Sequence, residues 1–400
     1  MVAVGVVGCG TAGAAAAIML ARAGRDVVVL ERVANPGPVG AGILLQPTGQ
    51  AVLARMGLYD AVAARCTRID RLWFRTPHGR TVVDLHYAAV DRAWFGLGLH
   101  RGVLFEALHS AACAEPRVEV RTGHAICALR RDGERIWIGD DAGNEHGPFD
   151  LVVVADGALS ELRAHAGHTI RDAPYPWGAL WFVAEDRDRI FPGELYQVAV
   201  GARRLYGVLP TGLGPRGDTP VVRLFWSLSA RELDAWWATS LDVWKAEVRA
   251  LDPRIDVVLD AITDHGQLTF ARYRDVRMAR WCDRNVVFIG DAAHATSPQL
   301  GQGANLALLD AMVLADCVGR GGSIDHALAL YCTQRGRHLR YYQWMTRMLT
   351  PVFQSDRRMF GWLRDWVFPV GNALPPIRNF MIRTMAGVSL GFARTPLALP

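Results

Sequence analysis

Three glycines near the N-terminus have the spacing of a phosphate-binding turn. Residues 8–13 read G-C-G-T-A-G, follow a valine-rich apolar run and precede an alanine-rich stretch with a helical pattern. In such a turn Gly8 allows a sharp change of direction, Gly10 lets a pyrophosphate approach the backbone, and Gly13 lets the helix pack closely on the strand. The start of that helix offers free N–H groups and the positive end of its dipole to a phosphate. The motif therefore predicts a bound dinucleotide.

A carboxylate stands where the ribose of such a dinucleotide would lie. A second β-branched run over 26–30 ends at Glu31, 18 residues after Gly13. This acid would accept hydrogen bonds from the adenosine ribose, which favours FAD or NAD over a cofactor with a 2′-phosphate. A glycine-rich turn alone would be only a tight turn, but the strand before it, the helix after it and the acid together indicate a dinucleotide site.

Two further loops combine glycine with an acid directly after a valine-rich strand. One has D-G at 156–157, and the other has G-D at 290–291. The latter is followed by Pro298 and then by G-Q-G-A-N at 301–305, where a helical pattern begins. Either loop by itself would also suit a β-turn that caps a helix.

The elements that must position these loops alternate between helices and strands. Helices are predicted around 50–56, 101–114, 305–318 and 324–345, and 40–46 is predicted to be a glycine-rich loop. Short strands are predicted over 71–86 and 117–153, and a second, sheet-based domain with two amphipathic helices over 175–273. Prolines at 351, 369, 375 and 376 are predicted to break the helical pattern of the last fifty residues.

The composition excludes several classes of protein. Hydrophobic residues make up 51% of the 400 and charged residues 21%, so the chain is neither disordered nor fibrous. The net charge of +5 includes no long basic block, which argues against a nucleic-acid arm. Seven scattered cysteines without zinc spacing indicate a reduced, cytoplasmic protein with no metal site. The apolar first twenty residues lack a basic segment before them, so neither a signal peptide nor a transmembrane span is expected.

The three loops, in this order, resemble those of the group A flavoprotein monooxygenases, the single-component family of para-hydroxybenzoate hydroxylase. The likeness covers residues 1–60, 98–165 and 280–320. It implies an α/β fold with three parts. These are a discontinuous Rossmann-like FAD-binding domain (1–70, 95–174 and 279–345), an inserted β-sheet substrate domain (71–94 and 175–278) and a C-terminal helical segment (346–400).

The resemblance also implies a reaction. Members of the family reduce FAD with NADH or NADPH, form a C4a-hydroperoxyflavin with O₂ and transfer one oxygen to an aromatic carbon, so the cofactor supplies the hard chemistry. No second G-x-G-x-x-G follows a strand in this chain, so the nicotinamide cofactor is expected to bind transiently. The expected substrate is a small phenol-, quinolone- or polyketide-like aromatic molecule.

Carried over residue by residue, the resemblance assigns the cofactor contacts. The FAD-binding residues would be Gly8, Gly10, Thr11, Ala12, Gly13, Glu31, Arg32, Arg101, Asp156, Gly290, Asp291, Pro298, Gly301, Gly303, Ala304 and Asn305. Pro298, Gly301 and Gly303 would position the flavin edge. The glycines let backbone N–H groups approach it, and the proline gives a dry wall without an N–H group. These three are the candidate catalytic positions, and no acid or base is identified.

Other side chains carry weaker indications. His294 follows the third loop at a position that is mostly structural in the family, and Cys9 is interpreted as a small filler. Aromatic residues of the second domain would cage the substrate; the candidates are Trp177, Trp181, Tyr196, Tyr206 and Phe225. Because alternate side chains of a strand point to opposite faces, about half of them are expected to point elsewhere. The arginines at 203, 204 and 223 would attract an anionic substrate or lie on solvated surface.

Two questions stay open from the sequence. The apolar C-terminal segment, with tryptophans at 344, 362 and 366, either packs on the flavin domain or forms a cap or peripheral membrane patch for a hydrophobic substrate. The preferred function is aromatic hydroxylation. The alternatives are an epoxidase or Baeyer-Villiger enzyme of the same scaffold, a flavin-dependent halogenase, and a non-catalytic flavin-binding accessory protein. The W-x-W-x-I-P motif usual in such halogenases is absent, which disfavours that alternative.

Overall fold

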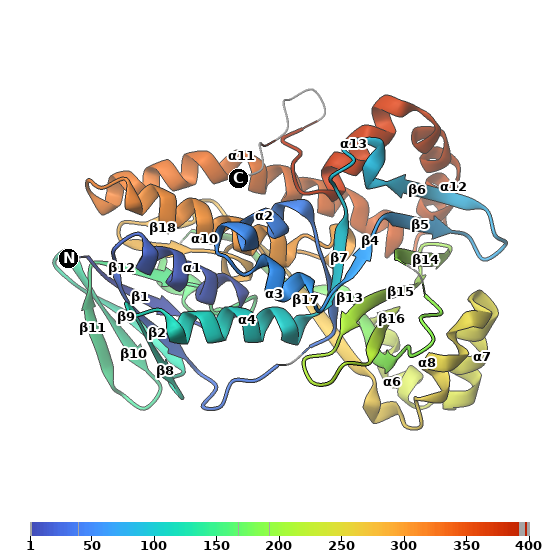
Figure 1. Ribbon diagram of the computed structural model, residues 1–400, viewed down its shortest axis with the longest axis horizontal. Helices are drawn as coiled ribbons and strands as arrows, with labels where there is room; N and C mark the ends of the chain where they lie inside the picture. Colours follow the sequence, from blue (N-terminus) through green and yellow to red (C-terminus); the bar gives the residue numbers. More distant parts are fainter. Residues whose placement is uncertain (1, 39, 167, 192, 392–396, 398–400) are drawn as a thin grey trace.

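The computed structural model describes residues 2–38, 40–166, 168–191, 193–391 and 397. The molecule has two ends, each built around a sheet (Figure 1). The N-terminal strands and helices lie at one end, the strands of a larger sheet lie at the other, and the long helix α11 (Ile324–Phe353) runs along the top.

A six-stranded sheet carries the glycine-rich turn. Its strands, in spatial order, are β18 (Cys282–Asp283), β19 (Val286–Phe288), β12 (Leu151–Val154), β1 (Ala3–Val7), β2 (Asp26–Glu31) and β8 (Val118–Thr122). Every pair is parallel except β18 with β19. Because the carboxyl ends of parallel strands share one edge, the loops after the neighbouring strands β1, β12 and β19 emerge side by side. This sheet order brings together three loops that are far apart in sequence.

The two faces of this sheet are covered differently. Helices α1 (Thr11–Arg22), α4 (Arg101–Ala114) and α10 (Gly303–Gly319) pack together on one face, with α2 (Pro47–Arg55) and α3 (Tyr59–Ala63) beside them. A small antiparallel sheet of β9 (Ile126–Asp132), β10 (Arg135–Asp140) and β11 (Glu145–Phe149) covers the other. A Cβ on Gly5 of β1 would lie 2.8 Å from the side chains of Ile138 and Phe149, so this glycine lets the small sheet approach.

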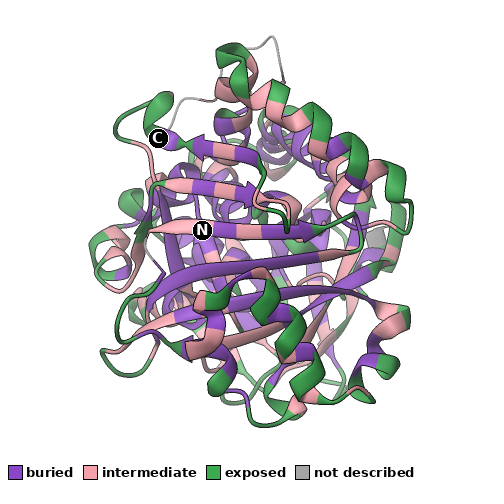
Figure 2. Ribbon diagram, turned by 90° about the vertical axis from the view of Figure 1, so that its right-hand side faces the viewer, coloured by how far each residue is buried: buried purple, intermediate pink, exposed green. Residues whose placement is uncertain are grey.

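A seven-stranded sheet forms the other end of the molecule. Its order is β17 (Thr269–Met278), β13 (Thr169–Glu185), β16 (Pro220–Ser229), β15 (Arg204–Leu213), β14 (Glu194–Val200), β5 (Arg71–Arg75) and β6 (Thr81–His86). One face packs through buried tryptophans against α6 (Leu233–Trp237), α7 (Leu241–Leu251) and α8 (Asp256–Asp260). A short sheet of β3 (Gly42–Leu45), β7 (Gly96–His100) and β4 (Thr67–Ile69) lies between the two ends. Figure 2 shows the strands largely buried and the outer helices largely exposed.

The C-terminal helices are longer than the proline pattern predicts. α11 continues through Pro351 to Phe353, and α12 (Arg358–Ala373) continues through Pro369. The prediction that these prolines break the helical pattern was wrong. A proline costs about 3 kcal/mol inside a helix because it removes one hydrogen bond and crowds the preceding turn. Both prolines lie near the C-terminal ends of their helices, so few helical residues follow them. Pro375 starts α13 (Pro375–Met385), where the first N–H groups have no intrahelical partner.

Two other expectations need correction. The segment 40–46, predicted to be a loop, contains strand β3, because residues 42–45 pair with β7. β13 begins at Thr169, so the predicted domain boundary at 174/175 lies inside a continuous strand, and the boundary at 345/346 lies inside α11. The remaining short helices are α5 (Arg163–Ala166), α9 (Asp291–His294), η1 (Tyr87–Ala89), η2 (Ala230–Glu232), η3 (Pro253–Ile255), η4 (His265–Gln267) and η5 (Pro298–Leu300).

No transmembrane span was expected from the sequence. Within the described part of the chain, no helix has both the length and the apolar character needed to cross a bilayer.

Candidate active site

The three glycines of the first turn meet three different surroundings. Gly8 has φ +92°, and a Cβ there would lie 2.7 Å from the carbonyl oxygen of Ala155. A Cβ on Gly13 would lie 1.9 Å from the carbonyl oxygen of Gly8, so only glycine lets the helix pack there. A Cβ on Gly10 would meet nothing within 4 Å, and this residue lines the large cavity described below. The turn therefore has its one open backbone position where a ligand would approach.

Glu31 is held beside this turn by backbone donors. Its Oε2 accepts a hydrogen bond from the N–H of Cys9 at 2.7 Å, and its Oε1 accepts one from Val33 at 3.0 Å. Burial, followed by the nearby Glu31 charge, raises the pKa of the Cys9 thiol to about 12. Cys9 is therefore a neutral thiol, as expected for a small residue that fills space. Arg32, which follows Glu31 in the sequence, is exposed. Each carboxylate oxygen keeps a free lone pair for a ribose hydroxyl.

The second loop presents an acceptor that the protein does not use. Asp156 Oδ1 is buried and has no hydrogen-bond partner among the described residues. Burial is the largest influence on this carboxyl and raises its pKa. Arg163, which starts α5, donates to the carbonyl oxygens of Ala158 at 2.9 Å and Ala292 at 3.0 Å, so it ties the second loop to the third. An unused buried acceptor beside the first turn fits a ligand that carries hydroxyl groups.

The third loop lies directly against the first. Gly290 has φ +58°, and a Cβ there would lie 2.9 Å from the Cβ of Ala12. Gly301 has a left-handed conformation, with φ +59° and ψ +28°, and Gly303 begins α10. A Cβ on Gly301 would meet nothing within 4 Å. The backbone before α10 is therefore bare on the side that faces the cavity.

A buried ionic network fixes this loop from behind. Asp310 accepts hydrogen bonds from the backbone N–H of Gly290 at 2.9 Å and from Arg335 Nε at 2.8 Å, and it lies 2.6 Å from His294 Nε2. Although burial opposes it, the charges of His294 and Arg335 lower the pKa of Asp310 to about 2. His294 therefore has a structural partner, although it also lines the cavity. The sequence signal for Asp310 was an acid between apolar residues, Leu306 to Leu309 before it and Ala311 to Ala315 after it.

His338 extends this network and must be neutral. Its Nδ1 lies 2.9 Å from Arg335 Nη1, which can only donate, and its Nε2 lies 2.7 Å from the carbonyl oxygen of Gly387, which can only accept. The hydrogen bonds thus assign the proton to Nε2. Burial, and then the Arg335 charge, lower the pKa of His338 to about 3.

Asn305 serves the backbone and not the cavity. Its Oδ1 accepts a hydrogen bond from the N–H of Gln46 at 2.8 Å, and its Nδ2 donates to the carbonyl oxygens of Leu44 at 3.2 Å and Gly301 at 3.1 Å. Its side chain is 1% exposed. Asn305 therefore holds strand β3 and the third loop together, and it does not line the cavity.

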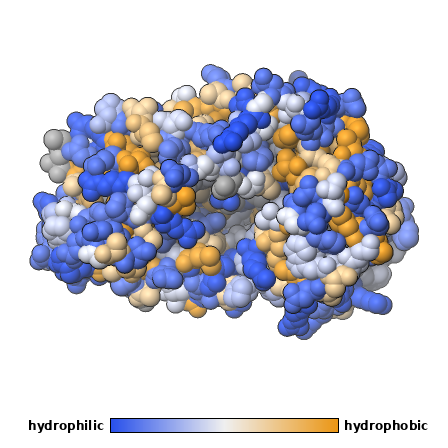
Figure 3. All heavy atoms as spheres, turned by 90° about the horizontal axis from the view of Figure 1, so that it is seen from below, coloured by the Kyte–Doolittle hydropathy of each residue, from blue (hydrophilic) through white to orange (hydrophobic). Residues whose placement is uncertain are grey.

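A cavity of about 1460 Å³ joins the glycine loops to the seven-stranded sheet. On the side seen from below, the surface is hollowed between the two ends of the molecule (Figure 3). The proposed cofactor residues that line this cavity are Gly10, Thr11, Ala12, Arg101, Asp291, Pro298, Gly301, Gly303 and Ala304. Gly8, Gly13 and Gly290 serve close packing instead, while Glu31, Arg32 and Asp156 surround the first turn without lining the cavity.

Only part of the expected aromatic cage faces this cavity. Trp181 and Phe225 line it and contact each other edge to face, with ring centroids 5.0 Å apart. Tyr196 and Tyr206 belong to the core under the opposite face of the sheet, where Tyr206 donates to Asp252. Trp177 is buried in the middle of β13 and does not line the cavity. Side-chain alternation along each strand accounts for the two tyrosines.

Arg223 is the cation on the sheet side of the cavity, whereas Arg101 lies among the cofactor loops. Its guanidinium stacks on the Trp181 ring at 4.1 Å and donates to the carbonyl oxygen of Gly42. Burial lowers the pKa of Arg223 to about 9, and no carboxylate among the described residues pairs with it. Arg203 and Arg204, by contrast, both pair with Glu232 outside the cavity. Sequence spacing gave no means of separating these three arginines.

Tyr273 is a neighbour of Arg223 that the sequence did not single out. It lines the cavity, and its Oη accepts a hydrogen bond from Trp181 Nε1 at 3.2 Å. Burial raises the pKa of this phenol above its ordinary value. Its own O–H therefore stays protonated and is free to donate to a bound molecule.

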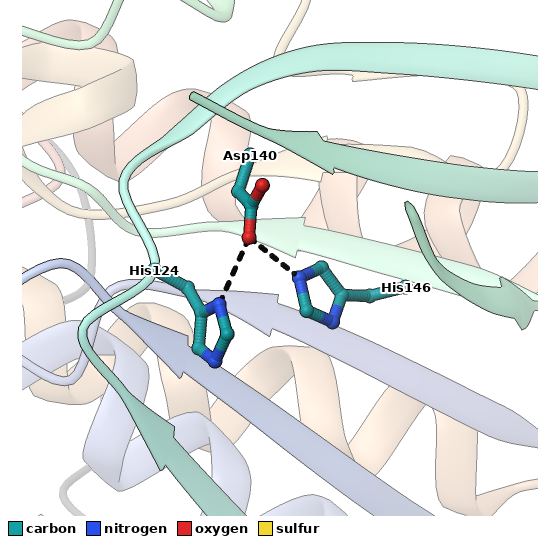
Figure 4. A group of neighbouring side chains, drawn as sticks. All are labelled: His124, Asp140 and His146. Carbon is teal, nitrogen blue, oxygen red and sulfur yellow. Dashed lines mark hydrogen bonds and ion pairs between the residues drawn. The ribbon is translucent and has the colours of Figure 1, made fainter. Parts of the chain in front are cut away.

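A separate His–Asp–His group lies on the small sheet (Figure 4). His124 Nδ1 and His146 Nε2 lie 2.9 and 3.2 Å from the same oxygen of Asp140. Asn144 donates to both oxygens of that carboxylate. The His124 hydrogen bond, followed by that of Asn144, holds the pKa of Asp140 below its usual range. These atoms satisfy one another around a turn, and none of these residues lines the cavity.

Comparisons with known proteins agree with this geometry. The family described as "FAD binding domain" matches residues 1–338. A 3-hydroxybenzoate 6-hydroxylase of Klebsiella oxytoca is 27% identical over 361 residues, with 88% of each chain covered. The 3-amino-4-hydroxybenzoate 2-monooxygenase PtmB3 of Streptomyces platensis is 31% identical over 347 residues, with 79% of each chain covered. The structure of HpxO from Klebsiella pneumoniae, complexed with FAD and uric acid, superposes with a TM-score of 0.81 at 22% identity and 98% coverage of both chains.

The contrast between Gly10 and Gly13 yields a prediction. Gly13→Ala should lower the free energy of unfolding by about 1–3 kcal/mol because its Cβ has no room. Gly10→Ala should change the free energy of unfolding by no more than about 1 kcal/mol. It should nevertheless weaken FAD binding about tenfold or more, because the added methyl group faces the ligand. Urea unfolding of the apoprotein and titration with FAD measure the two effects. Equal loss of stability in both variants would contradict this assignment.

The neutral His338 yields a pH dependence. Its folded pKa lies below its unfolded value of about 6.5, so the unfolded chain binds the extra proton and acid destabilises the fold. Between pH 7.5 and pH 5 the free energy of unfolding should fall by about 2 kcal/mol through this group. His338→Gln should remove that part of the fall. His326→Gln, at an exposed histidine of the same helix, should keep it. Urea unfolding at pH 7.5 and pH 5 measures this fall for each variant. The same fall in His338→Gln and in His326→Gln would refute the prediction.

Proposed function

The chain belongs to the FAD binding domain family, and from that premise we propose that it hydroxylates an aromatic small molecule that carries an acidic oxygen. It is an FAD-dependent monooxygenase that consumes NADH or NADPH and O₂. The observation that carries the proposal is the buried cation at Arg223, which faces a cavity lined by aromatic side chains and lacks a carboxylate partner among the described residues.

The Arg223 site suits a phenolate, an enolate or a carboxylate. A buried guanidinium without an acid is costly to hold, and an anionic substrate would supply the missing partner. The Trp181 ring beneath the guanidinium and the adjacent Phe225 ring would enclose a flat aromatic body. Tyr273 would donate its O–H to the same substrate oxygen and, together with Arg223, would stabilise the deprotonated form of that oxygen. An oxygen kept anionic makes the ring carbons beside it rich in electrons, as oxygen transfer to carbon requires.

The cofactor end is formed by the three loops. The open backbone at Gly10 and the start of α1 would receive the pyrophosphate, Glu31 the adenosine ribose, and Asp291 the ribitol side. Gly301, Gly303 and Ala304 would bring backbone N–H groups to the flavin edge, and Pro298 would keep water away from it. When bound, FAD takes up electrons from the nicotinamide cofactor and activates O₂. The protein contributes position, charge and exclusion of water.

The proposal also assigns roles to regions of the chain. With the boundaries moved to the start of β13 and the end of α11, residues 1–70, 95–168 and 279–353 would hold the cofactor, and 71–94 with 169–278 would bind the substrate. The relatives act on hydroxylated or aminated benzoates by name, which agrees in class with an anionic aromatic substrate.

Substitution of Arg223 tests the substrate class. Arg223→Gln should raise KM for an anionic aromatic substrate by about 10- to 100-fold, because a charge-assisted hydrogen bond contributes about 1.5–3 kcal/mol. FAD absorbance should be unchanged. Arg203→Gln is the matched control, since that side chain pairs with Glu232 outside the cavity. Substrate-stimulated oxidation of NADH or NADPH across a panel of phenols and benzoates gives the readout. A panel without any stimulation, or equal effects in both variants, would defeat the proposal.

A further inference from the structure

The cavity extends well beyond the Arg223 site. Its volume of about 1460 Å³ includes the space at the cofactor loops, and the lining continues from Arg223 across the sheet as far as β6. One face of the seven-stranded sheet forms its floor, and every one of the seven strands contributes lining residues. The polar groups of this floor gather on β13, β16 and β17, whereas the other four strands present almost only hydrocarbon.

A cross-strand row leads from the cation into this apolar half. Arg223 on β16 pairs with Leu209 on β15. The pairing of Tyr196 with Val208 places Leu195 of β14 next in the row, and Leu195 then pairs with Leu72 on β5. Leu72 pairs with Leu85 on the edge strand β6. One guanidinium is therefore followed by four leucines, all of which line the cavity.

A second row runs parallel to the first. Phe225 pairs with Gly207, Gly207 with Gln197, Gln197 with Phe74, and Phe74 with Val83. Gly207 has no side chain, so the floor is lower at this point beside Leu209. Gln197 is the single polar side chain of this row. At about 4.8 Å per strand, the four steps from β16 to β6 span about 19 Å.

The roof over these rows is also apolar. It consists of Met345, Leu349 and Phe353 from α11, Val367 and Phe368 from α12, and Phe380 and Met381 from α13. Phe353 stands between the floor and α12, with its ring 5.4 Å from that of Phe74 and 6.1 Å from that of Phe368. Apart from Gln197, the floor rows beyond Arg223 and the roof are thus built from aliphatic and aromatic side chains. An apolar space of this kind binds apolar ligands.

We propose that the region from Leu209 to Leu85 is a binding subsite for an apolar chain, so that the substrate is an amphiphile with an acidic aromatic head at Arg223. The identity of the head rests on the function proposed above, but the subsite rests on the two rows and the roof. Trp366, Val367 and Val370 of α12 line the cavity and are also 52–62% exposed. The far end of the subsite therefore reaches the surface at α12, where a chain would enter.

Affinity for a homologous series tests the subsite without turnover. The probes are 4-n-alkylbenzoates from methyl to octyl, titrated calorimetrically into the FAD-loaded enzyme. Each added methylene should tighten Kd by about fourfold, the equivalent of about 0.8 kcal/mol per buried CH₂, until the compartment is filled. A Kd that does not change with chain length, or the absence of binding at every length, would overturn the proposal.

Two substitutions locate the chain along the row. Leu209→Trp, next to Arg223, should remove the chain-length dependence at all lengths. Val83→Trp, on the edge strand, should leave short chains unaffected and abolish the gain for long ones. Val200→Trp is the matched control, since Val200 is 40% exposed and does not line the cavity. FAD absorbance checks the fold of each variant. If one variant misfolds, the Kd series of the wild type still tests whether the subsite exists.

The two proposals fail in different ways. Normal stimulated turnover of small aromatics with a flat Kd series would defeat the subsite alone. A steep Kd series without NADH or NADPH oxidation by any aromatic would defeat the hydroxylase and leave the subsite standing.

Discussion

The buried carboxylate of Asp310 holds together the parts on which the site depends. It lies in the middle of α10 with no exposed surface, and it binds the backbone of the third loop, His294 beneath that loop and Arg335 of α11. Through Arg335 and His338 the same network reaches the carbonyl oxygen of Gly387, after the last helix. A buried acid is tolerable only when donors surround it. These donors come from segments far apart in the chain, so the acid fixes their relative positions.

Packing of bare backbone is the second constraint. The first and third loops touch because Gly290 has no side chain to collide with Ala12, and α1 lies on its strand because Gly13 has none to collide with Gly8. The cofactor loops are therefore preorganised by contacts within the protein. Gly10 and Gly301 are different, since neither is needed for packing and both are open toward the cavity.

Much of this arrangement could be predicted from the sequence because it depends on short-range signals. The first turn, the acid at Glu31 and the strand-loop pattern at 156 and 290 each lie within a few residues of the strands that position them. The segment 40–46 was misjudged because its pairing partner, β7, lies about fifty residues away. The prolines of α11 and α12 were misjudged because a local rule does not see how near the helix end is or what packs on the helix.

The substrate side was less predictable for a related reason. Alternate side chains of a strand point to opposite faces of the sheet, but the strand's own sequence does not say which set faces the cavity. Trp181 and Phe225 therefore could not be separated from Tyr196 and Tyr206, nor Arg223 from Arg203 and Arg204. Tyr273 carried no local pattern at all. Asn305 lies in the first turn of α10, and only the structure shows that its amide binds the backbone of Leu44 in β3 and of Gln46.

The order of strands in the larger sheet has an evolutionary consequence. The strand that contacts the third cofactor loop is β17 at one edge of the sheet, whereas β5 and β6 lie at the opposite edge and come from a separate stretch of the chain that precedes the other strands. Mutations in β5 and β6 can change the shape of this end of the cavity without altering the cofactor loops or the Asp310 network. A few substitutions in this hairpin can thus change the range of substrates during evolution while the cofactor-binding loops stay intact.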